Sequence, residues 1–180
     1  HILPFRVPTG SVLFPIGYFC MQKSFQETQD IKSMFFTASV ASFIKLINLF
    51  SPATPVIKVL NPAACVLLEG LAVAIVFTIY QYKDSDIGLK QALIMSSSWR
   101  IGYYILCFAI FIPLMMMKSS SILDFGKFVE FFIINGLINS IIIYVYGKIP
   151  SKSKKVSRIK YNLPLSASLF LLAVIVTWVI

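Results

Sequence analysis

The chain consists of long apolar runs that alternate with short polar segments. The clearest run, 62–82, follows Asn61-Pro62 and holds about twenty almost uninterrupted apolar residues. At ~1.5 Å per residue, a helix of this length spans a hydrocarbon core about 30 Å thick. Proline is tolerated at the first helical position, so Asn61-Pro62 predicts the start of a transmembrane helix.

Five other runs have a similar character, although the first is short and contains Pro15. We expect six membrane-spanning helices, over residues 10–21, 33–50, 62–82, 91–117, 128–146 and 161–180. Residues 22–32 form the first clearly polar loop between them. The predicted fold is therefore an all-α integral membrane protein, a single transmembrane domain over 1–180 built as a bundle of about six helices.

Composition supports the membrane class. Of the 180 residues, 58% are hydrophobic and 13% are charged, whereas soluble domains have about 45–50% and 25%. The formal net charge of +9 would suggest nucleic acid as a partner of a soluble chain. Here the loop lysines account for it and no nucleic-acid motif is present, so the expected partner is the lipid bilayer and not nucleic acid.

Lysine and arginine are concentrated in the loops after the first, third and fifth runs. The richest of these loops is 147–160. The positive-inside rule places these loops in the cytoplasm and both ends of the chain outside. The predicted location is a bacterial inner (cell) membrane, with the basic loop next to anionic lipid or an acidic partner.

Four polar residues lie within the runs at overlapping depth: Lys45, Glu69, Arg100 and Asn135. A charge near the centre of a bilayer costs at least ~2.5 kcal/mol on insertion scales, so such residues face the bundle interior and one another. We expect Glu69 to pair with Lys45 or Arg100. Because Asn61, Cys65 and Glu69 are four residues apart, they share one face of their helix.

This polar cluster has two interpretations. As a solute pocket, its two cations exceed its one carboxylate, which favours an anionic, vitamin-like solute. As a structural element, it is a buried ion pair and amide that fix the register of the helices. No HExxH, GxSxG or paired-carboxylate pattern is present, so neither enzyme activity nor a cofactor is expected.

The segment NPAACVLLEGL, residues 61–71, occurs in a small hydrophobic chain with a Pro-rich loop before it. In these features the chain resembles the S components, the substrate-binding membrane subunits of energy-coupling factor transporters. The resemblance implies a helical bundle that binds a vitamin or metal ion and works with energising partner subunits. It also implies that two small residues four apart, here Ala38 and Ser42, contact the transmembrane coupling subunit.

The predicted function is thus a transport subunit that binds a small solute through Lys45, Glu69, Arg100 and Asn135. One alternative is a non-catalytic structural or assembly subunit of a membrane complex. A second is a cobalt or nickel uptake subunit, since metal-transporting members of the same family present an N-terminal histidine and the sequence begins with His1. A lone histidine is a weak basis for a metal site, so none is otherwise expected.

Overall fold

The structure is a computed structural model, and it describes residues 9–50, 54–80, 87–119 and 123–148. In these ranges the chain is mostly helical and contains no strand, which confirms the all-α prediction there. Among the helical segments, η1 is a 3-10 turn, and η2 and η3 are π-helical. The element order is α1 (Thr9–Thr28), α2 (Lys32–Leu46), η1 (Ile47–Phe50), α3 (Val56–Tyr80), α4 (Leu89–Leu106), η2 (Cys107–Phe111), α6 (Phe125–Phe128), η3 (Val129–Ile134) and α7 (Asn135–Lys148).

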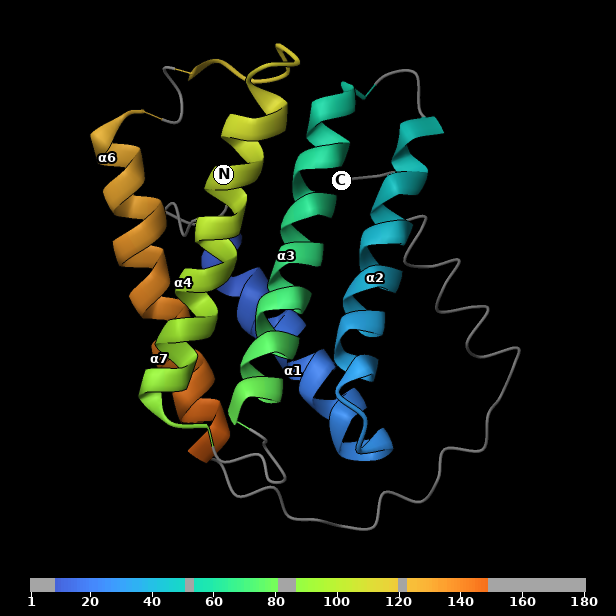
Figure 1. Cartoon of the computed structure of the whole chain (residues 1–180), viewed down its shortest axis with the longest axis vertical. Helices are drawn as coiled ribbons and strands as arrows, with labels where there is room; N and C mark the ends of the chain where they lie inside the picture. Colours follow the sequence, from blue (N-terminus) through green and yellow to red (C-terminus); the bar gives the residue numbers. More distant parts are fainter. Residues whose placement is uncertain (1–8, 51–53, 81–86, 120–122, 149–180) are drawn as a thin grey trace, which may run out of the picture.

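The helices form an up-and-down bundle closed on one face by α1 (Figure 1). Helices α2, α3, α4 and the helix made of α6, η3 and α7 lie side by side. Helix α1, which contains Pro15, crosses behind this row and contacts α2, α3 and α7. The interior of the protein is therefore the space between α1 and the row.

Four helical segments are long and apolar enough to cross a membrane. They are Lys32–Phe50, Val56–Tyr80, Leu89–Phe111 and Phe125–Lys148. These match four of the six expected spans, although the one expected over 91–117 ends at Phe111. Helix α1 is not among them, and the run 161–180 lies outside the described residues. The structure thus supports a membrane protein with four candidate spans in the described part.

The start of α3 differs from the prediction. The sequence pattern places it at Pro62, whereas α3 begins at Val56 and contains Pro62 within the helix. The residues before Pro62 extend the apolar run, and in lipid a helix satisfies backbone groups that a loop would leave unpaired. That gain outweighs the one hydrogen bond that an internal proline removes. Glu69 consequently lies near the middle of a 25-residue helix.

The first polar loop is shorter than expected. The sequence predicts a loop over 22–32, but α1 continues to Thr28. Gln22 and Phe25 are buried, and the ring of Phe25 packs edge-on against Phe77 with 5.3 Å between centroids. The polar residues of this segment therefore lie on a helix that also has a buried apolar face.

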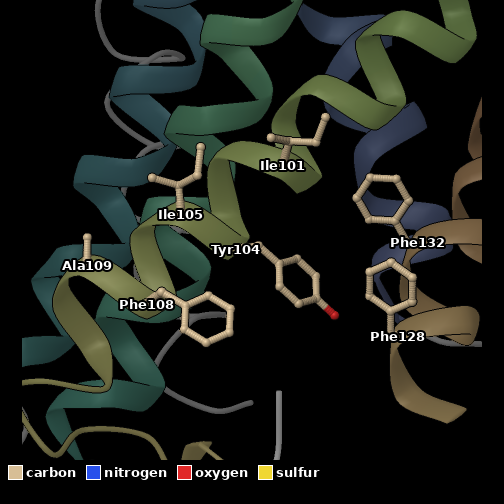
Figure 2. A pocket seen from close by; sticks show the side chains of 7 residues that line it. All are labelled: Ile101, Tyr104, Ile105, Phe108, Ala109, Phe128 and Phe132. Atoms are coloured by element: carbon tan, nitrogen blue, oxygen red, sulfur yellow. The ribbon is translucent and has the colours of Figure 1, made fainter. Parts of the chain in front are cut away.

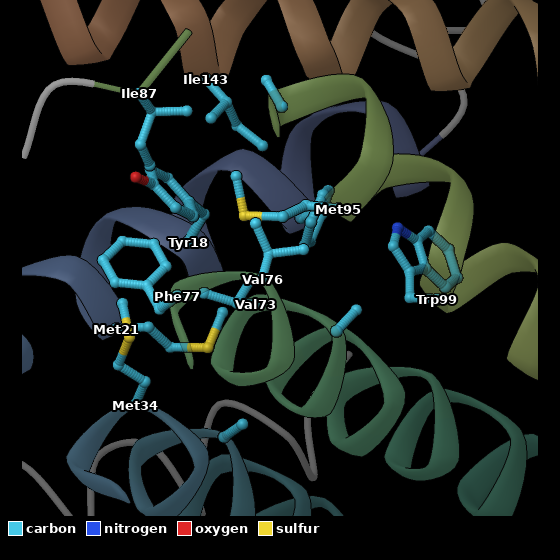
Figure 3. Packing of buried hydrophobic residues seen from close by; sticks show 14 of the residues in the cluster. Tyr18, Met21, Met34, Val73, Val76, Phe77, Ile87, Met95, Trp99 and Ile143 are labelled. Carbon is cyan, nitrogen blue, oxygen red and sulfur yellow. The ribbon is translucent and has the colours of Figure 1, made fainter. Parts of the chain in front are cut away.

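The hydrophobic core surrounds the C-terminal half of α3 (Figure 3). Val73, Val76 and Phe77 contribute from α3 itself. The other helices add large side chains around them, among them Tyr18, Met21, Met34, Ile87, Met95, Trp99 and Ile143. This half of the bundle is closely packed, which fixes the positions of α1, α2, α4 and α7 around α3.

Small residues bring α2 and α3 together, as their presence in the run 33–50 predicts. A methyl group built on Gly70 would overlap with the Cβ of Ala38. The hydroxyl of Ser42 donates a hydrogen bond to the carbonyl of Ala63 at 2.9 Å. Ala38 and Ser42 are both buried at this contact. In this structure the two residues that the resemblance assigns to a coupling subunit are used within the chain.

Candidate functional site

A cavity of about 460 Å³ lies beside the N-terminal half of α3. Helices α1, α2 and α3 enclose it, and Trp99 of α4 and Phe131 of η3 complete its wall. The lining residues are Leu13, Ile16, Gly17, Cys20, Met21, Thr37, Ala38, Ala41, Asn61, Pro62, Cys65, Val66, Glu69, Trp99 and Phe131. One half of α3 is thus packed in the core while the other half faces a hollow.

Glu69 is the one charged side chain among these lining residues. It is 8% exposed, and a Cβ placed on Gly17 of the facing helix would lie 4.0 Å from its Oε2 atom. The carboxylate interacts electrostatically with Arg100. No hydrogen bond joins it to another residue of the described ranges. A buried carboxylate with this environment retains its capacity to accept hydrogen bonds from a bound molecule.

The face of α3 predicted from the sequence is present. Asn61, Cys65 and Glu69 all line the cavity, and the Cys65 thiol donates a weak hydrogen bond to Asn61 Oδ1 at 3.9 Å. On α2, the Thr37 hydroxyl donates to the Ser33 carbonyl at 2.8 Å. The remaining wall is apolar, which is the usual composition of a small-molecule site.

Arg100 is buried, with 1% exposure, but it is not among the residues that line the cavity. Its Nε donates to the carbonyl of Phe131 at 2.8 Å, and its Nη1 donates to the carbonyl and hydroxyl oxygens of Ser96, both at 2.6 Å. Its guanidinium carbon lies 4.5 Å from the ring centroid of Trp99 and 5.3 Å from that of Phe131. Arg100 therefore links α4 to η3 and supports two aromatic side chains of the cavity wall.

The π-helical segment explains why the Phe131 carbonyl can receive Arg100. In an α-helix, the backbone N–H of Asn135 would donate to Phe131, four residues earlier. Here it donates to Glu130, five residues earlier. The Phe131 carbonyl is thereby released from its usual partner and accepts the arginine N–H. Such π-helical turns are rare and often occur at functional sites.

Further hydrogen bonds join α4 to α7. The Ser96 hydroxyl donates to the Gly136 carbonyl at 3.0 Å, and the Ser140 hydroxyl contacts the carbonyls of Gly136 at 2.7 Å and Ala92 at 3.3 Å. We call the residues that make these bonds, Ala92, Ser96, Gly136 and Ser140, together with Arg100, the α4–α7 seam. Asn135 and Asn139 are also buried on α7 and, like Arg100, take part in further contacts. The seam is a polar helix contact within a largely apolar bundle.

Of the four residues that the sequence groups together, Glu69 and Arg100 interact electrostatically in the structure, but Glu69 alone is among the residues that line the cavity. Glu69 lines the cavity, Arg100 and Asn135 lie along α4 and α7, and Lys45 is half-buried on α2 and does not line the cavity. Sequence reasoning also missed the aromatic wall formed by Trp99 and Phe131. The position of Trp99 next to a buried arginine was the available signal, because aromatic rings commonly cover guanidinium groups.

The buried indole N–H of Trp99 has no hydrogen-bond partner. An unsatisfied buried donor costs about 1–3 kcal/mol. Trp99 is held between neighbours, with its ring 5.7 Å from Phe14 and 5.5 Å from Phe131, centroid to centroid. The cavity wall therefore includes one residue with an unused donor as well as one carboxylate with unused acceptors.

Metal-ligating side chains do not gather in the described part of the chain, where no group of three or more His, Cys, Asp or Glu residues could hold an ion. Cys20, Cys65 and Cys107 are free thiols there. His1, the basis of the cobalt and nickel alternative, lies outside the described residues. The structure thus adds no metal site to the cavity.

A second hollow of about 660 Å³ lies between α4 and the helix that contains α6 and η3 (Figure 2). Its lining is apolar apart from the Tyr104 hydroxyl, and consists of Ile101, Tyr104, Ile105, Phe108, Ala109, Phe128 and Phe132. The absence of charge among these residues gives the hollow little means to select one solute over another. The cavity next to Glu69 is the stronger candidate site.

Comparison with known proteins does not identify the chain, because no protein-family model, curated protein or solved structure matches it. The function therefore has to be inferred from the chemistry of the cavity and from the sequence.

Proposed function

We propose that this protein is a membrane transport subunit that binds a small solute in the cavity beside Glu69. The observation that carries the proposal is a buried carboxylate facing a hollow of about 460 Å³ near the middle of a membrane-spanning helix. Because the sequence contains no nucleotide-binding motif, energy for transport comes from a partner subunit or an ion gradient. This organisation agrees with the resemblance to S components.

The cavity has suitable dimensions and chemistry for this role. Small-molecule sites have volumes of about 300–1,000 Å³ and apolar walls with a few polar groups. An ionisable residue placed deep in a membrane is expensive and usually marks a solute or ion pathway. Glu69 has this property, and a solute that donates hydrogen bonds to it would offset part of its cost.

The predicted orientation gives the cavity a direction of access. The positive-inside rule places the loop between α2 and α3 on the outer side of the membrane. The cavity lies along the half of α3 that follows this loop, whereas the closely packed core lies along the other half. A solute would thus enter from outside and be stopped by the core.

Native mass spectrometry of the gently solubilised full chain tests this proposal. We expect a stoichiometric small molecule on the wild-type protein and its loss in Glu69→Gln. Glu130→Gln is a matched control, because it makes the same chemical change at an exposed position and should retain the molecule. A molecule that stays bound in Glu69→Gln, or a preparation that never carries one, contradicts the proposal.

A structural or assembly subunit is the second candidate, and the α4–α7 seam favours it. The hydrogen bonds of Ser96, Arg100 and Ser140 are used to join helices of this chain. If the other polar residues serve the same purpose, native mass spectrometry will show protein partners and no small molecule. Neutralising the lysines of 147–160 should then release those partners.

A further inference from the structure

We propose that the solute is an organic cation: an amine carried on an apolar body, with its charge recognised by Glu69. This inference rests on the proposed function and assigns the chemical class of the solute. It differs from the anionic solute that the sequence pattern favours. The difference arises because the structure places one of the three charged residues, and not all of them, in the cavity wall.

The charge of the cavity wall favours a cation. Among the residues that line the cavity, Glu69 is charged and Lys45 and Arg100 are absent. An ammonium group in contact with the carboxylate would form a charge-assisted hydrogen bond, which is about twice as strong as a neutral one. A carboxylate or phosphate on the solute would meet Glu69 and be repelled by it.

The guanidinium of Arg100 does not reverse this preference. Its Nε and Nη1 donate to oxygen atoms of Phe131 and Ser96, which hold the guanidinium between α4 and η3, and Arg100 is not among the residues that line the cavity. Coulomb energy falls with distance, so a cation touching Glu69 gains more than it loses to an arginine outside the wall. The seam therefore keeps the positive charge away from the cavity.

The rest of the wall fits the body of such a solute. Trp99 and Phe131 present aromatic surface, and Leu13, Ile16 and Val66 present aliphatic surface. Binding of an apolar body against these side chains is favourable, because it removes apolar surface from water.

Three compounds that share an indole ring and differ in their polar group test whether binding depends on the charge of the solute or on its shape. Tryptamine carries an ammonium group, tryptophol a hydroxyl and indole-3-propionate a carboxylate. Equilibrium dialysis of each labelled compound against the purified full chain measures its affinity. We expect saturable binding that is tightest for tryptamine and weakest for indole-3-propionate.

Two variants test the role of Glu69 and the location of the site. Glu69→Gln should weaken tryptamine binding about tenfold to hundredfold and leave tryptophol almost unchanged, since only the ammonium forms a charge-assisted bond. Glu130→Gln should alter neither. Gly17→Leu keeps the carboxylate but fills part of the cavity beside it, because a Cβ at Gly17 already lies 4.0 Å from Glu69 Oε2. It should therefore weaken both compounds equally.

The outcomes distinguish this inference from the proposed function. If indole-3-propionate binds most tightly, or Glu69→Gln leaves tryptamine binding unchanged, the cation assignment is overturned. Sensitivity of that binding to Gly17→Leu would still support a solute site in the cavity. If none of the three compounds binds saturably, the cation assignment also fails, and the native mass spectrum decides the proposed function by itself.

Discussion

Arg100 and Glu69 present two different environments for a buried charge in one bundle. Both lie near the middle of helices that are long and apolar enough to span a membrane, and they interact electrostatically. Arg100 donates three hydrogen bonds to neighbouring residues, whereas Glu69 has no hydrogen bond within the described ranges and faces a cavity. The comparison indicates that a charge within a membrane span is structural where the chain satisfies it, and available for binding where the chain does not.

The different chemistry of backbone donors and acceptors accounts for this contrast. In a helix each N–H is already used, while each carbonyl oxygen retains a second lone pair. A buried arginine can therefore find acceptors on the backbone of a neighbouring helix, as Arg100 does at Ser96 and Phe131. A buried carboxylate needs donors, which a helical backbone does not supply. Glu69 must obtain them from a side chain or a ligand.

Arg100→Met should produce the largest loss of stability. The variant removes all the hydrogen bonds of the guanidinium and leaves the Phe131 carbonyl and the Glu69 charge without their partner. Removal of one member of a buried charged group costs about 3–5 kcal/mol. Unfolding in SDS, followed by circular dichroism, measures this cost. A variant as stable as the wild type would show that the seam is not structural.

Gly70→Ala should cause the next largest loss of stability. The variant tests the contact between α2 and α3 at the boundary between the packed and hollow halves of α3. The added methyl group overlaps with Ala38, and overpacking of this kind costs about 1–3 kcal/mol. Gly17→Ala is the matched control, since its methyl group would make one ordinary contact, 4.0 Å from Glu69 Oε2, and no overlap. The same unfolding measurement should show restoration by the second change Ala38→Gly. Equal stability of the two single variants would contradict the close approach of α2 and α3.

Much of this arrangement could be predicted from the sequence, but the cavity could not. The apolar runs predict four of the described spans, and the spacing of Asn61, Cys65 and Glu69 predicts a shared face. Depth along a helix can be counted from residue numbers, whereas the direction of a side chain depends on how helices rotate against one another. For this reason the sequence placed Lys45 and Arg100 in one pocket with Glu69, whereas in the structure Arg100 interacts electrostatically with Glu69 but neither Lys45 nor Arg100 lines the cavity.

The π-helical turn shows a second limit of sequence reasoning. A shift from four to five residues in the hydrogen-bond register of Val129–Ile134 releases the Phe131 carbonyl for Arg100. Nothing in the sequence VEFFII marks such a shift, since these residues suit an ordinary α-helix in a membrane equally well. The register becomes visible only with the tertiary contact that it permits, the bond from Arg100 to the released carbonyl.

Ser96→Ala should have a smaller effect, of about 1 kcal/mol. The variant loses the bond from the Ser96 hydroxyl to Gly136 and one acceptor of Arg100. Single hydrogen bonds between membrane helices contribute about 0.6 kcal/mol on average and at most ~1.7. Ser98→Ala is the control, because the Ser98 hydroxyl is exposed and donates to the Ile94 carbonyl of its own helix. Identical unfolding of the two variants would remove Ser96 from the seam.

Glu69→Gln should have the smallest effect on stability, although it has the largest expected effect on binding. The change removes a buried charge that has no hydrogen bond to the described residues, and Arg100 keeps its hydrogen bonds to Phe131 and Ser96. The gain from lower desolvation therefore offsets the lost attraction to Arg100. We expect a free energy of unfolding within about 0.5 kcal/mol of the wild type, which is the range of surface substitutions. A loss as large as that of Arg100→Met would instead make Glu69 one half of a structural ion pair. The two charges would then belong to one seam, and the difference between them that supports a binding site would disappear.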